Sequence, residues 1–148
     1  MPKKATKIDT TCTDYNVPIY LFHQGSNCRS YEYLGSHRVQ NGVAFRVWAP
    51  NAAAVSVVGS FNNWDENACP MTRISENGIW EAVSDAVQLY DTYKYCIITP
   101  TGEKRYKTDP YGYHCETRPD NASKYYELDG FEWHDAKYLA DKKRFAVV

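Results

Sequence analysis

The sequence lacks several features that would point directly to a protein class. No apolar run approaches the roughly 18 residues of a membrane-spanning helix, and no apolar segment follows the N-terminal lysines to make a secretory signal. The five cysteines are odd in number and include no Cys-x-x-Cys pair, which argues against both a disulfide framework and a zinc site. These absences favour a reducing, cytoplasmic location.

An excess of charge of one sign is also missing. The 17 basic residues nearly balance the 18 acidic residues, the net charge is −1, and the lysines and arginines are scattered along the chain. A nucleic-acid or membrane-surface partner would need a basic patch or a basic amphipathic helix. We therefore expect neither nucleic acid nor membrane among the partners. A length of 148 residues is most simply one domain with one core and tails.

Catalytic groups are not visible in the pattern. Glycoside chemistry, for example, needs two carboxylates about 5 to 10 Å apart on a rigid scaffold. The candidates all lie in predicted turns, where we expect solvated carboxylates: Asp65, Glu66, Asp109, Glu116 and Asp120. The (β/α)₈ barrel that often carries this chemistry takes about 250 residues, which exceeds this chain.

The histidines and glycines predict no metal site and no phosphate-binding loop. The four histidines are far apart in the sequence, and the eight glycines occur singly at predicted turns. We therefore expect no metal, no cofactor and no catalytic residue in this chain.

Four segments can be distinguished along the sequence. Residues 1–14 are polar and without period, which predicts a flexible tail. Residues 15–40 are expected to form an ordered lead-in of short extended or turn pieces that end at glycines. Residues 41–130 contain the strand-like runs, and residues 131–148 are expected to form a short helix or linker.

Alternating apolar residues predict a succession of short strands. In 42–48, for example, Val43, Phe45 and Val47 share one face, as in a half-buried strand. Further strand-like runs, bounded by turn residues, cover 54–59, 78–83, 92–98, 104–107 and 123–128. Their number and spacing predict an all-β fold, an immunoglobulin-like antiparallel β-sandwich. Asp135 is a suitable N-cap for a helix that ends near Lys142 and Phe145.

Aromatic residues are abundant, with four tryptophans and 13 tyrosines. Large rings serve both sandwich cores and ligand platforms. Trp48 and Trp80 lie within strand patterns, so we expect them to pack in the sandwich or against a neighbouring domain, and Trp133 should pack the C-terminal helix onto the body. Trp64 follows Asn62 and Asn63 in a turn and is expected to be exposed, with amides beside it that can bind hydroxyls.

The order of motifs resembles the front of bacterial 1,4-α-glucan branching enzymes of the α-amylase superfamily, which carry a family 48 carbohydrate-binding module before the catalytic barrel. The resemblance runs from about Tyr20 to Leu139 and rests on Phe22-His23-Gln24-Gly25, Tyr31-Glu32-Tyr33-Leu34-Gly35-Ser36-His37, Phe45-Arg46-Val47-Trp48-Ala49-Pro50-Asn51-Ala52, Val55-Ser56-Val57-Val58-Gly59-Ser60-Phe61-Asn62-Asn63-Trp64, Gly78-Ile79-Trp80-Glu81, Leu89-Tyr90, Tyr93-Lys94-Tyr95, Lys107-Thr108-Asp109-Pro110-Tyr111 and Arg118-Pro119-Asp120-Asn121-Ala122-Ser123. Similar modules occur in isoamylase-type debranching enzymes and in the β subunit of AMP-activated protein kinase.

The resemblance implies a set of glucan-binding residues. In glucan-binding members, the tryptophan equivalent to Trp64 stacks on glucose, and the lysine equivalent to Lys94 bonds hydroxyls. A later loop supplies polar contacts, and its nearest positions here are Asn121 and Ser123. The kinase modules carry a second tryptophan after the lysine strand. This chain has Gly102-Glu103-Lys104-Arg105-Tyr106 there, so Tyr106 is the candidate substitute.

Two functions remain open from the sequence. The resemblance implies a non-catalytic module that binds and positions α-1,4-glucans, such as glycogen or maltooligosaccharides, for a branching enzyme that transfers a glucan segment to a 6-hydroxyl. Alternatively, the chain is a structural docking domain for the catalytic barrel without sugar affinity, or the same module from an isoamylase-type debranching enzyme.

Overall fold

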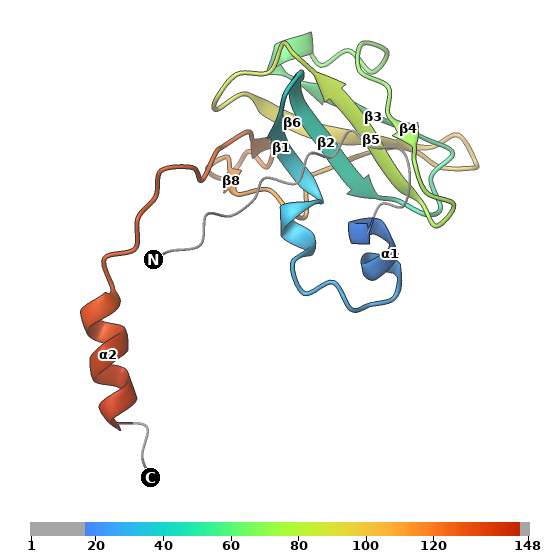
Figure 1. Cartoon of the computed structure of the whole chain (residues 1–148). Coiled ribbons are helices and arrows are strands. Elements are labelled where there is room, and N and C mark those ends of the chain that lie inside the picture. Colours follow the sequence, from blue (N-terminus) through green and yellow to red (C-terminus); the bar gives the residue numbers. More distant parts are fainter. Residues whose placement is uncertain (1–16, 146–148) are drawn as a thin grey trace.

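Two antiparallel sheets form a β-sandwich in the computed structural model, which describes residues 17–145 (Figure 1). One sheet has the order β1-β2-β5-β4, and the other has the order β3-β6-β9-β8 with β7 also paired to β6. This architecture confirms the all-β sandwich that the alternating pattern predicted. The predicted tail, residues 1–14, lies outside the described residues.

The first sheet is built around the run that alternates most regularly. Val43, Phe45 and Val47 of its central strand are buried in the core between the sheets, as the period-2 pattern predicted. The sheet consists of β1 (Gly35–Val39), β2 (Gly42–Trp48), β4 (Thr72–Arg73) and β5 (Ile79–Ser84). The short strand β4 was not expected from the sequence.

The second sheet has β6 at its centre. β6 pairs with β3 along one edge, and its other edge pairs first with β9 and then with β7. The strands are β3 (Ala54–Gly59), β6 (Thr92–Ile98), β7 (Lys104–Lys107), β8 (His114–Cys115) and β9 (Ser123–Lys124). β9 is shorter than the predicted strand 123–128, and β8 was not predicted. A strand of two residues is too short to show an alternating pattern.

The lead-in differs from its prediction in part. It contains a 3₁₀ turn, η1 (Ser30–Glu32), and the strand β1, as expected of turn and extended pieces, but it begins with a helix, α1 (Val17–His23), which was not expected. Ile19 and Phe22 of α1 pack against a second cluster that contains Leu34 and Ile79. A short apolar run reads equally well as strand or helix, so this tertiary contact, which the sequence does not show, decides the outcome.

The tryptophans follow their predictions only in part. Trp80 is buried in the core, whereas Trp48 is 52% exposed and lies on the outer face of its sheet. Its ring contacts the Phe22 ring edge-on, with centroids 5.5 Å apart, and its indole N–H donates to the Asn77 carbonyl oxygen. Trp48 therefore does not pack inside the sandwich, because the pleat turns this last residue of β2 outward. The alternative expectation, packing against a neighbouring domain, stays a prediction.

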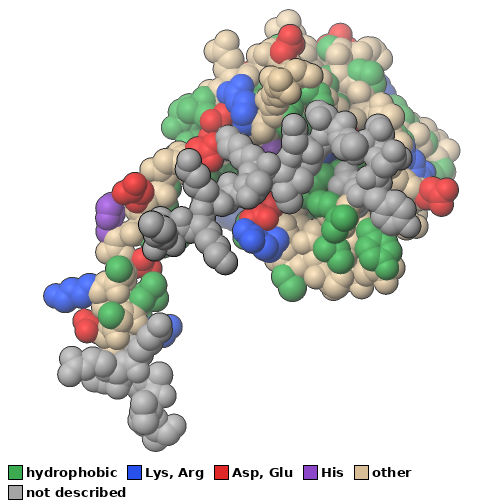
Figure 2. All heavy atoms as spheres, viewed as in Figure 1, with side chains coloured by type: hydrophobic (Ala, Val, Ile, Leu, Met, Phe, Trp, Pro, Cys, Tyr) green, Lys and Arg blue, Asp and Glu red, His purple; other side chains and the backbone are tan. Residues whose placement is uncertain are grey.

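The predicted C-terminal helix is present as α2 (Ala136–Phe145), and it begins directly after Asp135. It projects away from the sandwich (Figure 1). Trp133 is 77% exposed and contacts Phe131, so the expectation that it packs the helix onto the body is wrong. Hydrophobic side chains gather on the visible surface over α1 and along α2 (Figure 2). Within the described part of the chain, neither helix is long and apolar enough to cross a bilayer.

Asp109 is a buried acceptor where the strands converge, not the solvated turn carboxylate that the sequence suggested. Its carboxylate accepts hydrogen bonds from the hydroxyls of Tyr93 (2.6 Å) and Tyr95 (3.1 Å) and from the amide of Tyr111 (2.8 Å). Its own amide donates to the Ser123 hydroxyl at 3.0 Å. Burial raises the pKa of Asp109 above its ordinary value.

We expect Asp109→Ala to lower the free energy of unfolding by about 2 to 5 kcal/mol, because two buried tyrosine hydroxyls would lose their acceptor. Urea unfolding of the 148-residue chain measures the change. Asp120→Ala, at an exposed position in the same region, is the matched control and should change stability by less than about 0.5 kcal/mol. Equal effects of the two substitutions would contradict the structural role of Asp109.

A pH prediction follows from the raised pKa of Asp109. The folded state binds a proton here more readily than the unfolded state, so this contribution to stability is present in acid and is lost as pH rises through the folded-state pKa. Asp109→Asn removes the titration. The stability of the native chain relative to this variant should therefore fall as pH rises from about 3.9, the ordinary pKa of aspartate, through the higher folded-state pKa. A constant difference across that range would contradict the prediction.

Candidate functional site

The turn after β3 is the structural basis of the candidate site. Gly59 ends the strand and lies so close to β6 that an added Cβ would be 2.3 Å from the Thr92 carbonyl oxygen. Asn62 then ties the turn to the strand, because its side-chain oxygen accepts from the Gly59 amide and its amide nitrogen donates to the Val57 carbonyl oxygen, both at 2.9 Å. The Asn62 side chain thus holds the turn in place.

The next two residues have left-handed backbone conformations. Asn63 has φ of 55° and Trp64 has φ of 59°. Asparagine tolerates this region, whereas for a bulky residue it is an uncommon conformation that costs of order 1 kcal/mol or more. The Trp64 amide donates to the Gly59 carbonyl oxygen at 2.9 Å, and 43% of the residue remains exposed. The expected exposure of Trp64 is confirmed.

Lys94 lies beside this turn on the outer face of the sheet. Lys94 pairs with Val58 of β3. The next residue of β3 is Gly59, whose carbonyl oxygen accepts the hydrogen bond from the Trp64 amide. The neighbouring residues Tyr93 and Tyr95 point into the core, so Lys94 points outward. Its ammonium group donates to the Asn121 side-chain oxygen at 2.5 Å. The structure therefore brings together Lys94 and Asn121, which the sequence could link only through the resemblance.

Tyr106 lies on the same outer face, on the neighbouring strand β7, opposite the residue of β6 that is two positions after Lys94. It pairs with Cys96, and its hydroxyl donates to Glu66, which also accepts from the Lys104 ammonium group. The hydrogen bond to Glu66 raises the pKa of Tyr106 to about 12, and the bond from Lys104 lowers the pKa of Glu66. Glu66 and Lys104 could not be predicted from the sequence as neighbours of the site, because they are 38 residues apart along the chain.

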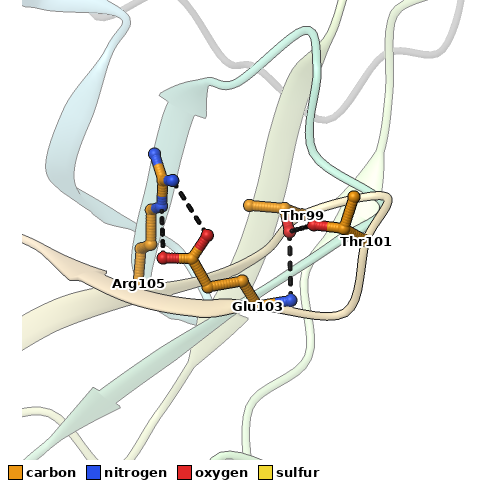
Figure 3. A network of polar contacts seen from close by, with 4 residues as sticks. All are labelled: Thr99, Thr101, Glu103 and Arg105. Atoms are coloured by element: carbon orange, nitrogen blue, oxygen red, sulfur yellow. Dashed lines mark hydrogen bonds and ion pairs between the residues drawn. The ribbon is translucent and has the colours of Figure 1, made fainter.

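The hairpin that leads to Tyr106 is held by local polar contacts (Figure 3). The Arg105 guanidinium donates to both carboxylate oxygens of Glu103, at 3.1 and 2.9 Å. The Glu103 amide donates to the Thr99 hydroxyl at 3.0 Å, and Thr99 is hydrogen-bonded to Thr101 at 2.8 Å. These contacts define the loop that precedes Tyr106.

Ser123 is placed differently from the other candidates. It is fully buried, and its hydroxyl accepts from the Asp109 amide. It belongs to the inward face of β9, so it supports the sheet beneath the candidate surface. Asn121, two residues earlier, is exposed, and its carbonyl oxygen accepts from the Thr108 hydroxyl at 2.5 Å.

Comparison with known proteins assigns the family. Residues 33–112 match Carbohydrate-binding module 48 (Isoamylase N-terminal domain). The chain is 48% identical over 143 residues to the 1,4-alpha-glucan branching enzyme GlgB of Halothermothrix orenii, which covers 94% of this chain and 22% of that protein. It is 42% identical over 129 residues to the GlgB of Bacillus subtilis, which covers 84% of this chain and 21% of that protein. The chain thus spans about a fifth of the length of these relatives.

Solved structures agree with the fold. Klebsiella pneumoniae pullulanase complexed with maltotriose matches with a TM-score of 0.51 at 29% identity, over 64% of this chain and 10% of that chain. Anoxybacillus pullulanase complexed with maltotetraose matches with a TM-score of 0.55 at 20% identity, over 69% of this chain and 16% of that chain. Because the family match spans more than half of the sequence and agrees with the observed sandwich, the chain belongs to the carbohydrate-binding module 48 family.

Proposed function

We propose that the outer face around Trp64 and Lys94 binds α-1,4-linked glucan, such as glycogen or maltooligosaccharides. The observation that carries this proposal is the conformation of Trp64. The large Trp64 ring is partly exposed and its backbone is left-handed. The turn that holds it there is fixed by the hydrogen bond between the Asn62 side chain and the Gly59 amide. Strain of this kind persists where the surrounding structure enforces it, and it often marks a binding site.

The chemistry of the surface suits a sugar. The Trp64 ring can stack on the weakly apolar face of a glucose unit. The ammonium group of Lys94, the side-chain amides of Asn63 and Asn121 and the hydroxyl of Tyr106 can bond sugar hydroxyls around it. Asn62 contributes by positioning the ring. Association costs about 4 kcal/mol or more in lost freedom, so one stacked ring with a few exposed hydrogen bonds gives millimolar affinity.

In the longer protein, the module would hold glucan for a cytoplasmic branching enzyme that transfers an α-1,4-linked segment to a 6-hydroxyl. The branching-enzyme relatives at 48% and 42% identity favour this reaction over debranching. The pullulanase structures share the fold, and one of them is a maltotriose complex. The transfer itself would belong to a catalytic barrel, which this chain does not contain.

A second candidate function is docking of the module onto such a barrel without sugar affinity. Exposed large hydrophobic residues favour it, and they gather on α1 and β2 and around α2: Val17, Tyr20, Trp48, Phe131, Trp133, Tyr138 and Leu139. Trp80, which the sequence suggested for this contact, is buried in the core instead. The apolar docking surface differs from the sugar-binding surface, so docking onto a barrel does not by itself exclude glucan binding.

We expect Trp64→Ala to abolish glucan binding by the 148-residue chain and to leave the melting temperature within a few degrees. The ring is partly exposed, and its removal also leaves a smaller residue on the strained backbone. Amide NMR titration with maltoheptaose measures binding, and cellohexaose tests the α linkage. In the unsubstituted chain, we expect amide chemical-shift changes to cluster at Trp64 and Lys94 with maltoheptaose and not with cellohexaose.

Two controls make this experiment decisive. Trp133→Ala removes an exposed tryptophan far along the chain and should leave binding unchanged. Trp64→Gly removes the ring and also relieves the left-handed strain, so it should be folded even if the alanine variant is not. No native shift at millimolar maltoheptaose would overturn the proposal and leave docking as the function. Collapse of both Trp64 variants would show that the ring is structural.

We further expect Asn62→Ala to weaken maltoheptaose binding although Asn62 is assigned no sugar contact. The substitution removes both hydrogen bonds that the Asn62 side chain makes to the backbone of the turn and of β3, at a cost of about 1 to 2 kcal/mol in stability. Asn63→Gly keeps those bonds and accepts the left-handed conformation, so its turn should stay formed. Tryptophan fluorescence should shift in the Asn62 variant and not in the Asn63 variant. Identical spectra would contradict the positioning role.

A further inference from the structure

Three rings contact one another at the edge of the second sheet, outside the residues assigned to the candidate site. Tyr90 and His114 have centroids 5.9 Å apart, Tyr90 and Tyr126 are 5.7 Å apart, and His114 and Tyr126 are 5.8 Å apart. Tyr90 is 53% exposed, and the other two residues are half-buried. We call Tyr90, His114 and Tyr126 the aromatic trio.

The strand register places the trio on the outer face that carries Lys94. Thr92 of β6 pairs with Lys124 of β9, and Lys124 pairs with His114 of β8. Paired residues of antiparallel strands point to the same face, and residues two apart on one strand do so as well. Thr92, Lys124 and His114 therefore form a row across the sheet, on the same face as Lys94.

The turn that carries Trp64 is bonded to the turn that carries Tyr90. The Ser60 hydroxyl donates to the Asp91 carboxylate at 2.9 Å and accepts from the Thr92 amide at 3.1 Å. Tyr90, like Trp64, has a left-handed backbone, with φ of 70°. In residues 17–145, the non-glycine residues with positive φ are Asn63, Trp64 and Tyr90, so both aromatic ones lie in these two joined turns.

We propose that the aromatic trio is a second sugar platform, which binds further glucose units of the same α-glucan chain that occupies the Trp64 surface. This inference rests on the proposed function and extends it from one subsite to an elongated face. A half-exposed tyrosine ring offers an apolar surface for a pyranose and a hydroxyl at its edge. Lys124 and Thr92, which lie between the two platforms, can bond the hydroxyls of the intervening units.

The distance between the platforms selects long chains. From β3, where the Trp64 turn begins, to His114 on β8 in the order β3-β6-β9-β8, three strand spacings amount to about 14 Å. One sugar ring cannot span this separation, whereas a chain of several glucose units can. The trio should therefore contribute to the binding of maltoheptaose and not to that of maltose, whose two glucose units are too short to reach both platforms.

The test compares the two sugars on three variants of the 148-residue chain by NMR titration. Tyr90→Gly removes the ring and relieves the left-handed strain, so the fold should be kept. We expect it to weaken maltoheptaose binding about 5- to 10-fold and to leave maltose binding unchanged. Tyr138→Ala, on α2, is the matched control for an exposed tyrosine and should alter neither affinity. His114→Ala is the second trio variant and should behave as Tyr90→Gly does.

The outcomes separate this inference from the function on which it rests. Native affinity for maltoheptaose in both trio variants, with no amide shifts at His114 and Tyr126, would overturn the second platform. If Trp64→Ala still abolished binding in that case, the proposed function would stand. Maltoheptaose binding that survives in Trp64→Ala but is lost in Tyr90→Gly would support the trio and overturn the Trp64 site. No binding of either sugar by the native chain would overturn both proposals.

Discussion

The structure depends on one buried carboxylate. Asp109 accepts hydrogen bonds from two tyrosine hydroxyls of β6, and its amide is bonded to Ser123 of β9. The Tyr93 hydroxyl also reaches Ser36 of β1, in the opposite sheet, at 3.1 Å. Tyrosines can fill this core only because their hydroxyls find partners, since an unpaired buried hydroxyl is costly. The Tyr93 hydroxyl thereby joins the two sheets, and the Asp109 contacts fix the segment between β7 and β8.

Successive residues of β6 serve the core and the outer surface of the second sheet in alternation. On β6, Tyr93 and Tyr95 point inward to Asp109, and the pleat therefore turns Lys94 outward toward Asn121. A rigid inner face fixes the positions of the outer polar groups. A surface built in this way can present side chains to an extended ligand without a deep cavity, because its preorganisation lowers the cost of binding.

The outer surfaces divide the molecule into two regions. The face of the second sheet carries a strained tryptophan and a strained tyrosine in two hydrogen-bonded turns, with polar groups between them. The region of α1, Trp48 and α2 instead exposes large apolar side chains, of the kind that another protein surface would cover. The two proposed functions use one region each, the sheet face for a sugar chain and the apolar region for another protein surface.

The sequence by itself determined the sandwich, its main strands and the exposed Trp64 turn, because alternation along a strand and turn residues are local signals. It did not predict α1, the burial of Asp109 or the outward position of Trp48, and these depend on contacts with distant segments. Val43 and Trp64 could thus be placed from their immediate neighbours. Strand register alone brought Lys94 to Asn121 and lined up Thr92, Lys124 and His114, because pairing between strands joins residues that no sequence spacing relates.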